Sequence, residues 1–363
     1  MRPTTPALPP TADLPTLTQA PLIPAFVLRT HHVHWPADHR FKAAARLLQS
    51  LWRADRGLPA GAFVTPEGHR RRLGSRLTFV SARAGANFLT PAIAHTVWRE
   101  LAYREIGALY DTDRLRLNLL SSQPLVFNLF APLKADLALA TRVMAELLPG
   151  FMDEVTDVLF EHAPARGHPA FTGDHTAFDL LIRGRTRSGQ RTFLALELKY
   201  AEGMTEAARP LHPRYDELAP MSGLFNDPAD PALRANPLQQ LFRQHCLAQA
   251  MLIRDVADVG AYVFVAPCLN HLAQGAATAY ATHLDEHNPA RVPFVPLTLE
   301  RLIEAIAAAG EPAHAAALHR RYTDFHQVDG ELEIAMAEQT RPEPHERERD
   351  ETLEGAEAAP PAA

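Results

Sequence analysis

Alternating apolar and polar positions predict two strands in the middle of the chain. Residues 192–200 read TFLALELKY and place two charged side chains, Glu197 and Lys199, on one face, because successive side chains of a strand point to opposite faces. The other face holds leucines and a tyrosine, and apolar residues on both faces are typical of a central strand in a covered sheet. Residues 176–185 predict the preceding strand, which carries Asp179.

The turn between these strands decides whether Asp179 can meet Glu197. A two-residue turn would place Asp179 opposite Leu198, on the wrong face. A three-residue turn over residues 187–189 places it opposite Glu197, with the two β-carbons roughly 5 Å apart. Such turns need a left-handed residue at the position that Gly189 occupies, so we predict this register.

Further elements follow from the spacing of apolar residues. Helices are expected over residues 41–54, 91–109, 134–148, 237–253 and 298–309, and strands over residues 155–161, 260–266 and 293–297. Residues 117–133 form an apolar segment whose polar side chains either stitch the core, which we favour, or line a cleft, a role for which Gln123 is the best candidate. Residues 202–236 are rich in proline and predict a long loop.

The charges on the two central strands point to a specific chemistry. Two carboxylates that face each other in a buried position repel, and without compensation one of them takes up a proton. A divalent cation resolves the conflict, and oxygen ligands favour Mg²⁺ or Mn²⁺. The alternative is an ordinary ion pair between Asp179 and Lys199, with Glu197 reaching solvent. Only three of the 36 basic residues are lysines, so a lysine in this cluster indicates a need for a compact ammonium group.

Composition excludes some classes of protein. A chain of 363 residues, 47% of them hydrophobic, forms one large domain or two modest ones. Its two cysteines, without a CxxC spacing, argue against a disulfide framework or a zinc site. No secretory signal and no apolar run of membrane-spanning length is evident, so we expect a cytoplasmic protein without a membrane partner.

Charge is unevenly distributed along the chain. Residues 338–363 contain eight acidic residues and three arginines, a net charge of −5 out of the total of −6, so the remainder is close to neutral. A near-neutral body with basic patches is compatible with DNA binding. The densest basic run, GHRRRLGSR, contains Arg70, Arg71 and Arg72. It is either a solvated loop or a phosphate contact, because arginine presents a planar donor fork. The histidines of residues 31–39 are expected in a loop ahead of a helix rather than at a metal.

The predicted order of elements is helix, strand, strand with Asp179, strand with Glu197-Leu198-Lys199, helix and strand. This order resembles the PD-(D/E)XK nuclease superfamily, whose members share the restriction-endonuclease-like fold. The segments SSQ…FN, FEH…GD…AFD and QQLFRQH are similar to a bacterial branch described as candidate restriction endonucleases. The likeness covers roughly residues 135–270, and Phe178 stands where the family motif has a proline.

The resemblance implies an α/β (α+β) mixed sheet with an αβββαβ core and metal-dependent hydrolysis of DNA phosphodiester bonds. Asp179 and Glu197 would hold Mg²⁺ or Mn²⁺, with the carbonyl of Leu198 as a further ligand. Lys199 would orient the attacking water and stabilise the developing charge.

Further residues of the site follow from the same resemblance. Some members take an extra acid from the first helix or strand, for which Glu146 and Glu161 are the candidates. We prefer Glu161, because it ends the strand next to the hairpin. The helix after the Glu-x-Lys strand is expected to expose Gln240, Arg243 and Gln244 on overlapping turns, where they can contact the substrate.

The chain divides into four predicted regions. Residues 1–20 and 336–363 are expected to be disordered, and residues 21–133 form a mainly helical region packed on a nuclease-like core of residues 134–335. The leading hypothesis is a metal-dependent DNA endonuclease of a restriction or defence type, for which a homodimer would suit double-strand cleavage. The alternative is a catalytically inactive module on the same fold that binds nucleic acid or supports an assembly.

Overall fold

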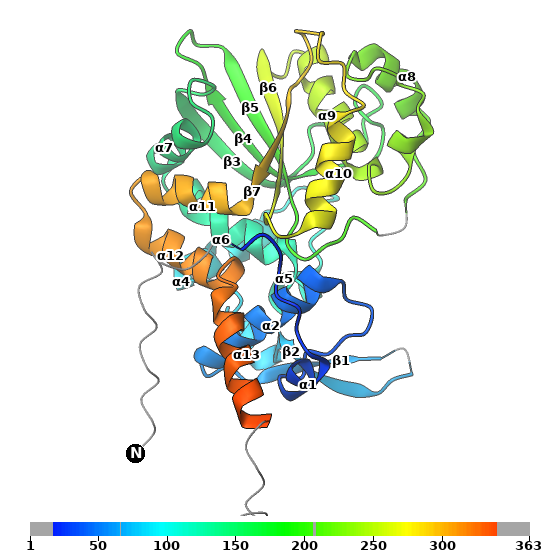
Figure 1. Ribbon diagram of the computed structural model, residues 1–363. Helices are drawn as coiled ribbons and strands as arrows, with labels where there is room; N and C mark the ends of the chain where they lie inside the picture. The colour runs from blue at the N-terminus through cyan, green and yellow to red at the C-terminus, as the bar shows by residue number, and fades with distance from the viewer. Residues whose placement is uncertain (1–16, 66, 206–207, 340–363) are drawn as a thin grey trace, which may run out of the picture.

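The computed structural model describes residues 17–65, 67–205 and 208–339. The protein is built around a five-stranded mixed sheet (Figure 1). The strands, in spatial order, are β3 (Glu154–His162), β4 (Phe178–Arg185), β5 (Arg191–Leu198), β6 (Val259–Ala266) and β7 (Phe294–Thr298). Neighbours are antiparallel from β3 to β5 and parallel from β5 to β7. Strand β5 is therefore central, as its two apolar faces predict.

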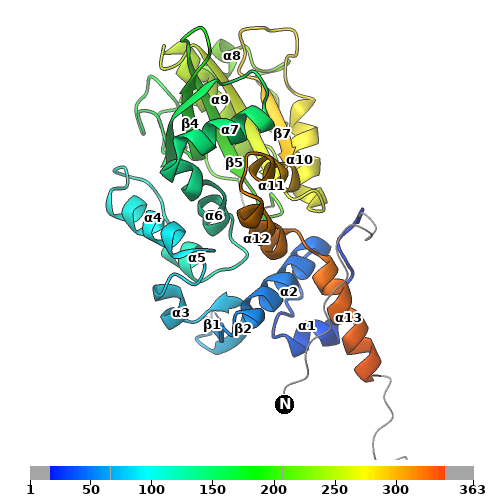
Figure 2. The same ribbon diagram turned by 90° about the vertical axis from the view of Figure 1, so that its left-hand side faces the viewer.

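Helices cover both faces of the sheet (Figures 1 and 2). One face packs on α6 (Ser122–Ala135), α7 (Leu137–Leu147) and α11 (Leu299–Ala308), and the other on α8 (Arg214–Ser222), α9 (Gln239–Ile253) and α10 (His271–Ala281). Alternate side chains of β5 enter the two cores, Leu196 on the first face and Phe193 on the second. The succession α7, β3, β4, β5, α9 and β6 is the expected αβββαβ core, so the predicted fold class is confirmed.

The remaining elements form a second layer below the sheet in Figure 1. They are α1 (Ala25–Thr30), α2 (Arg40–Asp55), β1 (Ala60–Val64), β2 (Arg70–Leu77), α3 (Phe79–Arg83), α4 (Pro91–Ala102), α5 (Thr112–Arg116), α12 (Pro312–Tyr322) and α13 (His326–Gln339). The short 3₁₀ helix η2 (Pro231–Arg234) is not part of this layer, because it packs against α9. One hydrophobic cluster joins Phe41 of α2, Leu125 of α6 and Leu196 of β5. The N-terminal region thus shares a core with one face of the sheet.

Several predicted boundaries differ from the structure. The helix expected over residues 91–109 ends at Ala102, because the apolar residues beyond it do not face a core but are exposed. The apolar segment 117–133 contains α6, which is buried on nearly every side and so lacks the periodicity of a surface helix. The basic run is strand β2 rather than a loop, and residues 202–236 include α8.

The chain ends and the histidine segment also carry predictions from the sequence. Residues 1–16 and 340–363, which hold most of the two termini expected to be disordered, lie outside the described residues, and α13 extends over 336–339. His39 precedes α2 and accepts a hydrogen bond from the Lys42 N–H, as expected of a loop ahead of a helix. No helix in the described part of the chain has the length and apolarity needed to cross a bilayer.

Candidate active site

The turn between β4 and β5 is built as predicted. The Thr186 N–H donates to the Gln190 carbonyl over 3.0 Å, and Gly189 has a left-handed φ of 83°. The ladder pairs Leu180 with Leu196, and the same register one residue further on brings Asp179 opposite Glu197. The predicted register is confirmed.

Helix α9 crosses the face of β5 that carries the charged residues, and its side chains surround Glu197. The Glu197 carboxylate, 1% exposed, accepts hydrogen bonds from Lys199 Nζ at 2.5 Å and Gln240 Nε2 at 2.6 Å. Gln244 donates to the other carboxylate oxygen. Gln240 also accepts from Lys199 Nζ at 2.9 Å. The ion pair of this structure is therefore Glu197 with Lys199, not Asp179 with Lys199.

Asp179 lies beside this ion pair, where its ionised form is disfavoured. Its Oδ2 accepts a hydrogen bond of 2.8 Å from the Leu198 N–H. Burial and the nearby Glu197 carboxylate raise the pKa of Asp179 well above its ordinary value, although Lys199 and the Leu198 N–H oppose this rise. The carboxylates thus compete for a compensating cation, as expected for two acids that share a buried face.

Lys199 is held in its charged form. Burial alone would lower the pKa of Lys199, but Glu197 and Asp179 outweigh it and raise the pKa above the ordinary value. A side chain with a raised pKa is a poor general base at neutral pH, and a good donor to an oxygen that gains negative charge.

Glu161, preferred over Glu146 as an additional acid, is brought to the same site. Burial, reinforced by Glu197 and opposed by Arg166, raises the pKa of Glu161 to about 7. Its φ of 47° is unusual inside a strand and marks local backbone strain near the carboxylates. Glu146 lies exposed on α7 and does not line the cleft.

These residues open into a cleft with a volume of about 750 Å³. The predicted site residues that line it are Glu161, Asp179, Glu197, Lys199, Gln123, Gln240, Arg243 and Gln244. Three exposed arginines, Arg104, Arg114 and Arg209, lie on its wall as well. The cleft thus joins a carboxylate floor to a basic border.

The predicted nucleic-acid contacts differ in accessibility. Gln240 is exposed, and Arg243 is half-buried and paired with Asp174 at 2.8 Å. Gln123 has a buried Oε1 for which the protein supplies no hydrogen-bond donor. Gln244 was expected to be exposed and is instead buried, because it also donates to the Ala177 carbonyl and accepts from the Tyr262 hydroxyl. Gln244 therefore holds the Glu197 carboxylate in place.

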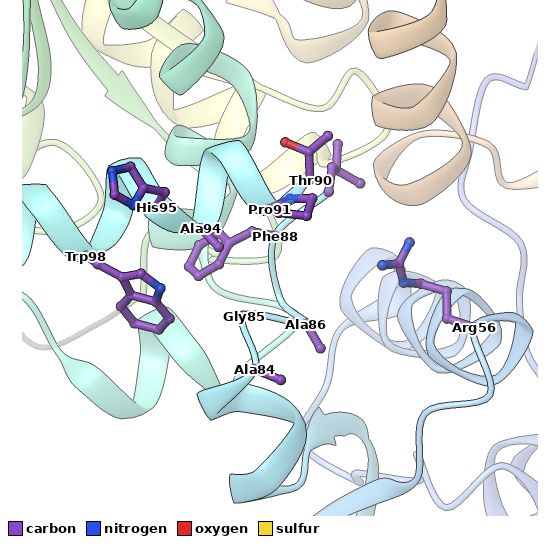
Figure 3. A pocket seen from close by; sticks show the side chains of 11 residues that line it. Arg56, Ala84, Gly85, Ala86, Phe88, Thr90, Pro91, Ala94, His95 and Trp98 are labelled. Atoms are coloured by element: carbon purple, nitrogen blue, oxygen red, sulfur yellow. The ribbon is translucent and has the colours of Figure 1, made fainter.

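Arg70, Arg71 and Arg72 do not belong to the cleft. They are exposed on β2, in a two-stranded ribbon that lies in the lower layer, away from the sheet (Figure 1). A second hollow of about 490 Å³ lies by the start of α4, between Phe88, Trp98 and Arg56 (Figure 3). No carboxylate is among its lining residues, so it offers none of the groups that the first cleft assembles.

Glu202 is the residue that sequence reasoning missed. Its carboxylate accepts from the Tyr200 N–H at 2.8 Å, the Ser122 N–H at 3.1 Å and Arg114 Nη2 at 3.2 Å. Burial would raise the pKa of Glu202, but Lys199 and these donors outweigh it and lower the pKa. Glu202 therefore joins the start of α6 to the strand that carries Lys199. In the sequence, the only sign of a role for Glu202 is its position three residues after Lys199. Its partner, the start of α6, lies in a segment whose pattern did not predict a helix.

A comparison with protein-family models matches residues 36–324 to the PD-(D/E)XK nuclease superfamily. The chain belongs to this superfamily. No curated protein and no solved structure matched the chain. Membership implies a nuclease, with nucleic acid as its substrate, and PD-(D/E)XK nucleases generally use divalent metals.

The donor set of this PD-(D/E)XK chain fits a divalent cation. Asp179 and Glu197 supply carboxylate oxygens on one face, and burial and the Glu197 carboxylate raise the pKa of Asp179 although Lys199 lies beside it, which favours a further cation. Hard cations such as Mg²⁺ prefer oxygen ligands of this kind. Within the described residues, no group of three or more acidic, histidine or cysteine side chains is arranged to hold a metal, so the set would be completed by backbone oxygens or water.

Proposed function

We propose that this protein is a metal-dependent endonuclease that hydrolyses phosphodiester bonds in DNA, in a restriction or defence role. The observation that carries the proposal is the meeting of Asp179, Glu197 and Lys199 in one cleft with arginines on its wall. Carboxylate oxygens suit a divalent cation, and guanidinium groups suit a phosphate backbone.

The roles of the central residues follow from their contacts. Asp179 and Glu197, with the carbonyl of Leu198, would hold Mg²⁺ or Mn²⁺. When bound, such a metal polarises a phosphoryl oxygen and lowers the pKa of a water ligand. Lys199 keeps its proton and donates to oxygen that becomes negative during hydrolysis. Gln240 contacts both Lys199 and Glu197 and so fixes their relative positions.

Substrate contacts are assigned to the polar residues around these groups. Gln123, with its unpartnered oxygen, can accept from a base or a water, and Arg243 can approach the backbone. Arg70, Arg71 and Arg72 supply a more distant phosphate contact on the ribbon of β1 and β2. A cytoplasmic homodimer would suit the cleavage of both strands of a duplex.

Cleavage assays test this proposal. Purified protein is incubated with plasmid, linear duplex and single-stranded DNA, with EDTA, Mg²⁺ or Mn²⁺. We expect cleavage only with metal, and its loss by at least about a hundredfold in Asp179→Asn and Glu197→Gln variants, because removal of one preorganised charge costs this much. Glu146→Gln, which alters an exposed carboxylate outside the cleft, is the control. Undiminished cleavage by the Glu197→Gln protein would overturn the proposal.

A second candidate function is a catalytically inactive module that binds nucleic acid. It is favoured by the hydrogen bonds that occupy Glu197, because Gln240, Gln244 and Lys199 all donate to it in this structure. A metal ion would have to replace at least one of these donors. Calorimetric titration with Mn²⁺ distinguishes the two candidates: the nuclease binds the ion in a manner that Glu197→Gln abolishes, whereas the inactive module binds DNA but no ion.

A further inference from the structure

One border of the cleft is a loop with an unusual surface. Residues 103–111, termed the rim loop, join α4 to α5. They expose three large apolar side chains, Tyr103 at 84%, Ile106 at 98% and Leu109 at 62%. Apolar residues that are exposed singly need no explanation, but three of them on one short loop beside a cleft make that loop a candidate binding surface.

Two polar side chains of the rim loop, Glu105 and Tyr110, hold it in place. Glu105 pairs with His162 and accepts from Arg166 Nη2 and from the Ala163 N–H. The Tyr110 hydroxyl donates to the Phe160 carbonyl over 3.4 Å. The loop is thus anchored to the end of β3, and its outward apolar tips are a consequence of this attachment.

The rim loop is continuous with the candidate active site. Leu109 and Tyr110 line the same cleft as Asp179, Glu197 and Lys199. The exposed Arg104 lines the cleft as well, and it directly follows Tyr103, which with Ile106 lies outside the cleft lining. A ligand that lies in the cleft and also meets this loop contacts arginines and exposed apolar side chains, which suits negative charge combined with flat apolar surface. A nucleic-acid strand with accessible base faces has both properties.

A regular duplex does not present such faces, because its bases are stacked and its charged backbone lies outside. Apolar side chains reach base faces only where a strand is single or where a wedge opens the stack. Aromatic side chains then act as platforms that accept any base.

Building on the nuclease function proposed above, we propose that the rim loop packs Tyr103 and Ile106 against unpaired bases next to the cleaved phosphate. The preferred substrate is then DNA with single-stranded character at the cleft, such as a free single strand, a gap or a branch point. Arg104 contributes a phosphate contact from the same loop.

Binding without metal tests this inference independently of cleavage. Fluorescein-labelled single-stranded DNA and a duplex of the same sequence are titrated with protein in EDTA, and anisotropy is measured. We expect tighter binding of the single strand, and a loss of about tenfold or more for it in Tyr103→Ala and Ile106→Ala, in the range of single base-stacking contacts. Duplex binding should be little affected.

The matched controls are Phe79→Ala and Val80→Ala, which remove exposed apolar side chains of α3 outside the cleft. They should leave both affinities unchanged. A fluorescent adenine analogue in the single strand reports stacking directly, and its signal should change with the wild-type protein and not with Tyr103→Ala.

Two results would overturn the inference. One is equal single-strand affinity of the wild-type and Tyr103→Ala proteins, with native circular dichroism for both. The other is dissociation of a dimer by Tyr103→Ala in sedimentation experiments with DNA affinity unchanged, which would assign the rim loop to a protein interface. The binding measurements require no metal, so they are independent of cleavage. A protein that cleaves no DNA but binds single strands through Tyr103 would refute the nuclease proposal and still support the rim-loop contact.

Discussion

Lys199 balances two acidic side chains in a place that water hardly reaches. It is 8% exposed and pairs with Glu197, and it is close enough to Asp179 for the two pKa values to influence each other. We therefore expect the charge of the lysine to stabilise the fold as well as to serve the proposed chemistry. Removing one partner of a buried ion pair leaves the other uncompensated.

The variant Lys199→Met isolates this effect. We expect it to lose about 3 to 5 kcal/mol of unfolding free energy, and to abolish cleavage. Urea denaturation at neutral pH measures the loss, and Mg²⁺ should restore part of it because a bound cation replaces the missing charge. Lys199→Arg, which keeps the charge, should be the milder variant. An unchanged denaturation midpoint for Lys199→Met would show that Glu197 does not depend on this partner.

His245 predicts how the protein responds to acid. The ring lies in the core beside Gln244 and contacts the Tyr280 hydroxyl and the Val292 carbonyl. Burial lowers the pKa of His245 from 6.5 to about 3. The unfolded chain thus binds a proton below pH 6.5 that the folded chain excludes.

Stability should consequently fall as the pH drops from 6.5 toward 3, by up to about 1.4 kcal/mol per pH unit from this residue alone. Urea midpoints measured at pH 7.5, 6 and 5 give the slope. His245→Gln retains a polar side chain without a titrating group and should reduce the slope. An identical slope in both proteins would mean that other groups control acid sensitivity.

At the level of residues, the central triad was predictable and much of its surroundings was not. Strand periodicity places Glu197 and Lys199 on one face, and the three-residue turn at Gly189 sets the register that brings Asp179 opposite Glu197. The burial of Gln244 could not be predicted, because the sequence pattern of a helical glutamine is the same whether its side chain is exposed or donates to a buried carboxylate. Glu202 lay beyond prediction, because its partner is a helix start in another region of the chain.

Among the elements, the β4–β5 turn is the feature with the most direct consequence for the site. Gly189 is in the left-handed region, and a β-carbon there would meet no neighbouring atom. Any cost of substitution is therefore conformational. The register itself is also held by β3 and β6, which pair with β4 and β5 on their outer edges.

We predict that Gly189→Ala destabilises the protein by about 1 kcal/mol, while cleavage persists because the flanking strands keep the register. Thermal denaturation and the plasmid assay measure the two effects. Gly189→Asn should cost less, since asparagine tolerates the left-handed region better. A stable Gly189→Ala protein without activity would show that the turn alone sets the register.

The helices and strands differ in how clearly the sequence pattern predicts them. Strands β4 and β5 and helix α2 have strong periodicity and lie where expected. Helix α6 was missed because burial on nearly all sides erases the contrast between its faces. The end of α4 was misplaced because Ile106 and Leu109 have helical spacing but are exposed on the rim loop.

Across the whole molecule, a buried arginine ties the chain together. Arg321 of α12 is fully buried and donates to the Asn87 carbonyl and side chain and to Gln49 of α2. Its guanidinium lies 4.0 Å from the ring centroid of Trp52. Gln49 in turn donates to the Tyr200 hydroxyl at the end of the Glu-x-Lys segment. These contacts connect α2 and α12 to the strand that carries the site.

Replacement of Arg321 by leucine should destabilise the whole protein. Several oxygens would lose their donors inside the core, at about 1 to 3 kcal/mol for each unsatisfied group. The neighbouring Arg320, whose side chain is 64% exposed and pairs with Asp55, is the matched control. Arg320→Leu should change stability by less than about 1 kcal/mol. Scanning calorimetry on both variants decides, and equal melting temperatures would contradict the structural role of Arg321.

The position of Arg321 also has a consequence for the order of synthesis. A ribosome releases residues 40–135 long before it releases α12, and domains generally fold as they emerge. We expect the early segment to have an incomplete core at that time, because Arg321, which donates to Asn87 and Gln49, has yet to be made. A nascent chain that stalls before α12 should therefore be a target for proteolysis rather than an independent domain.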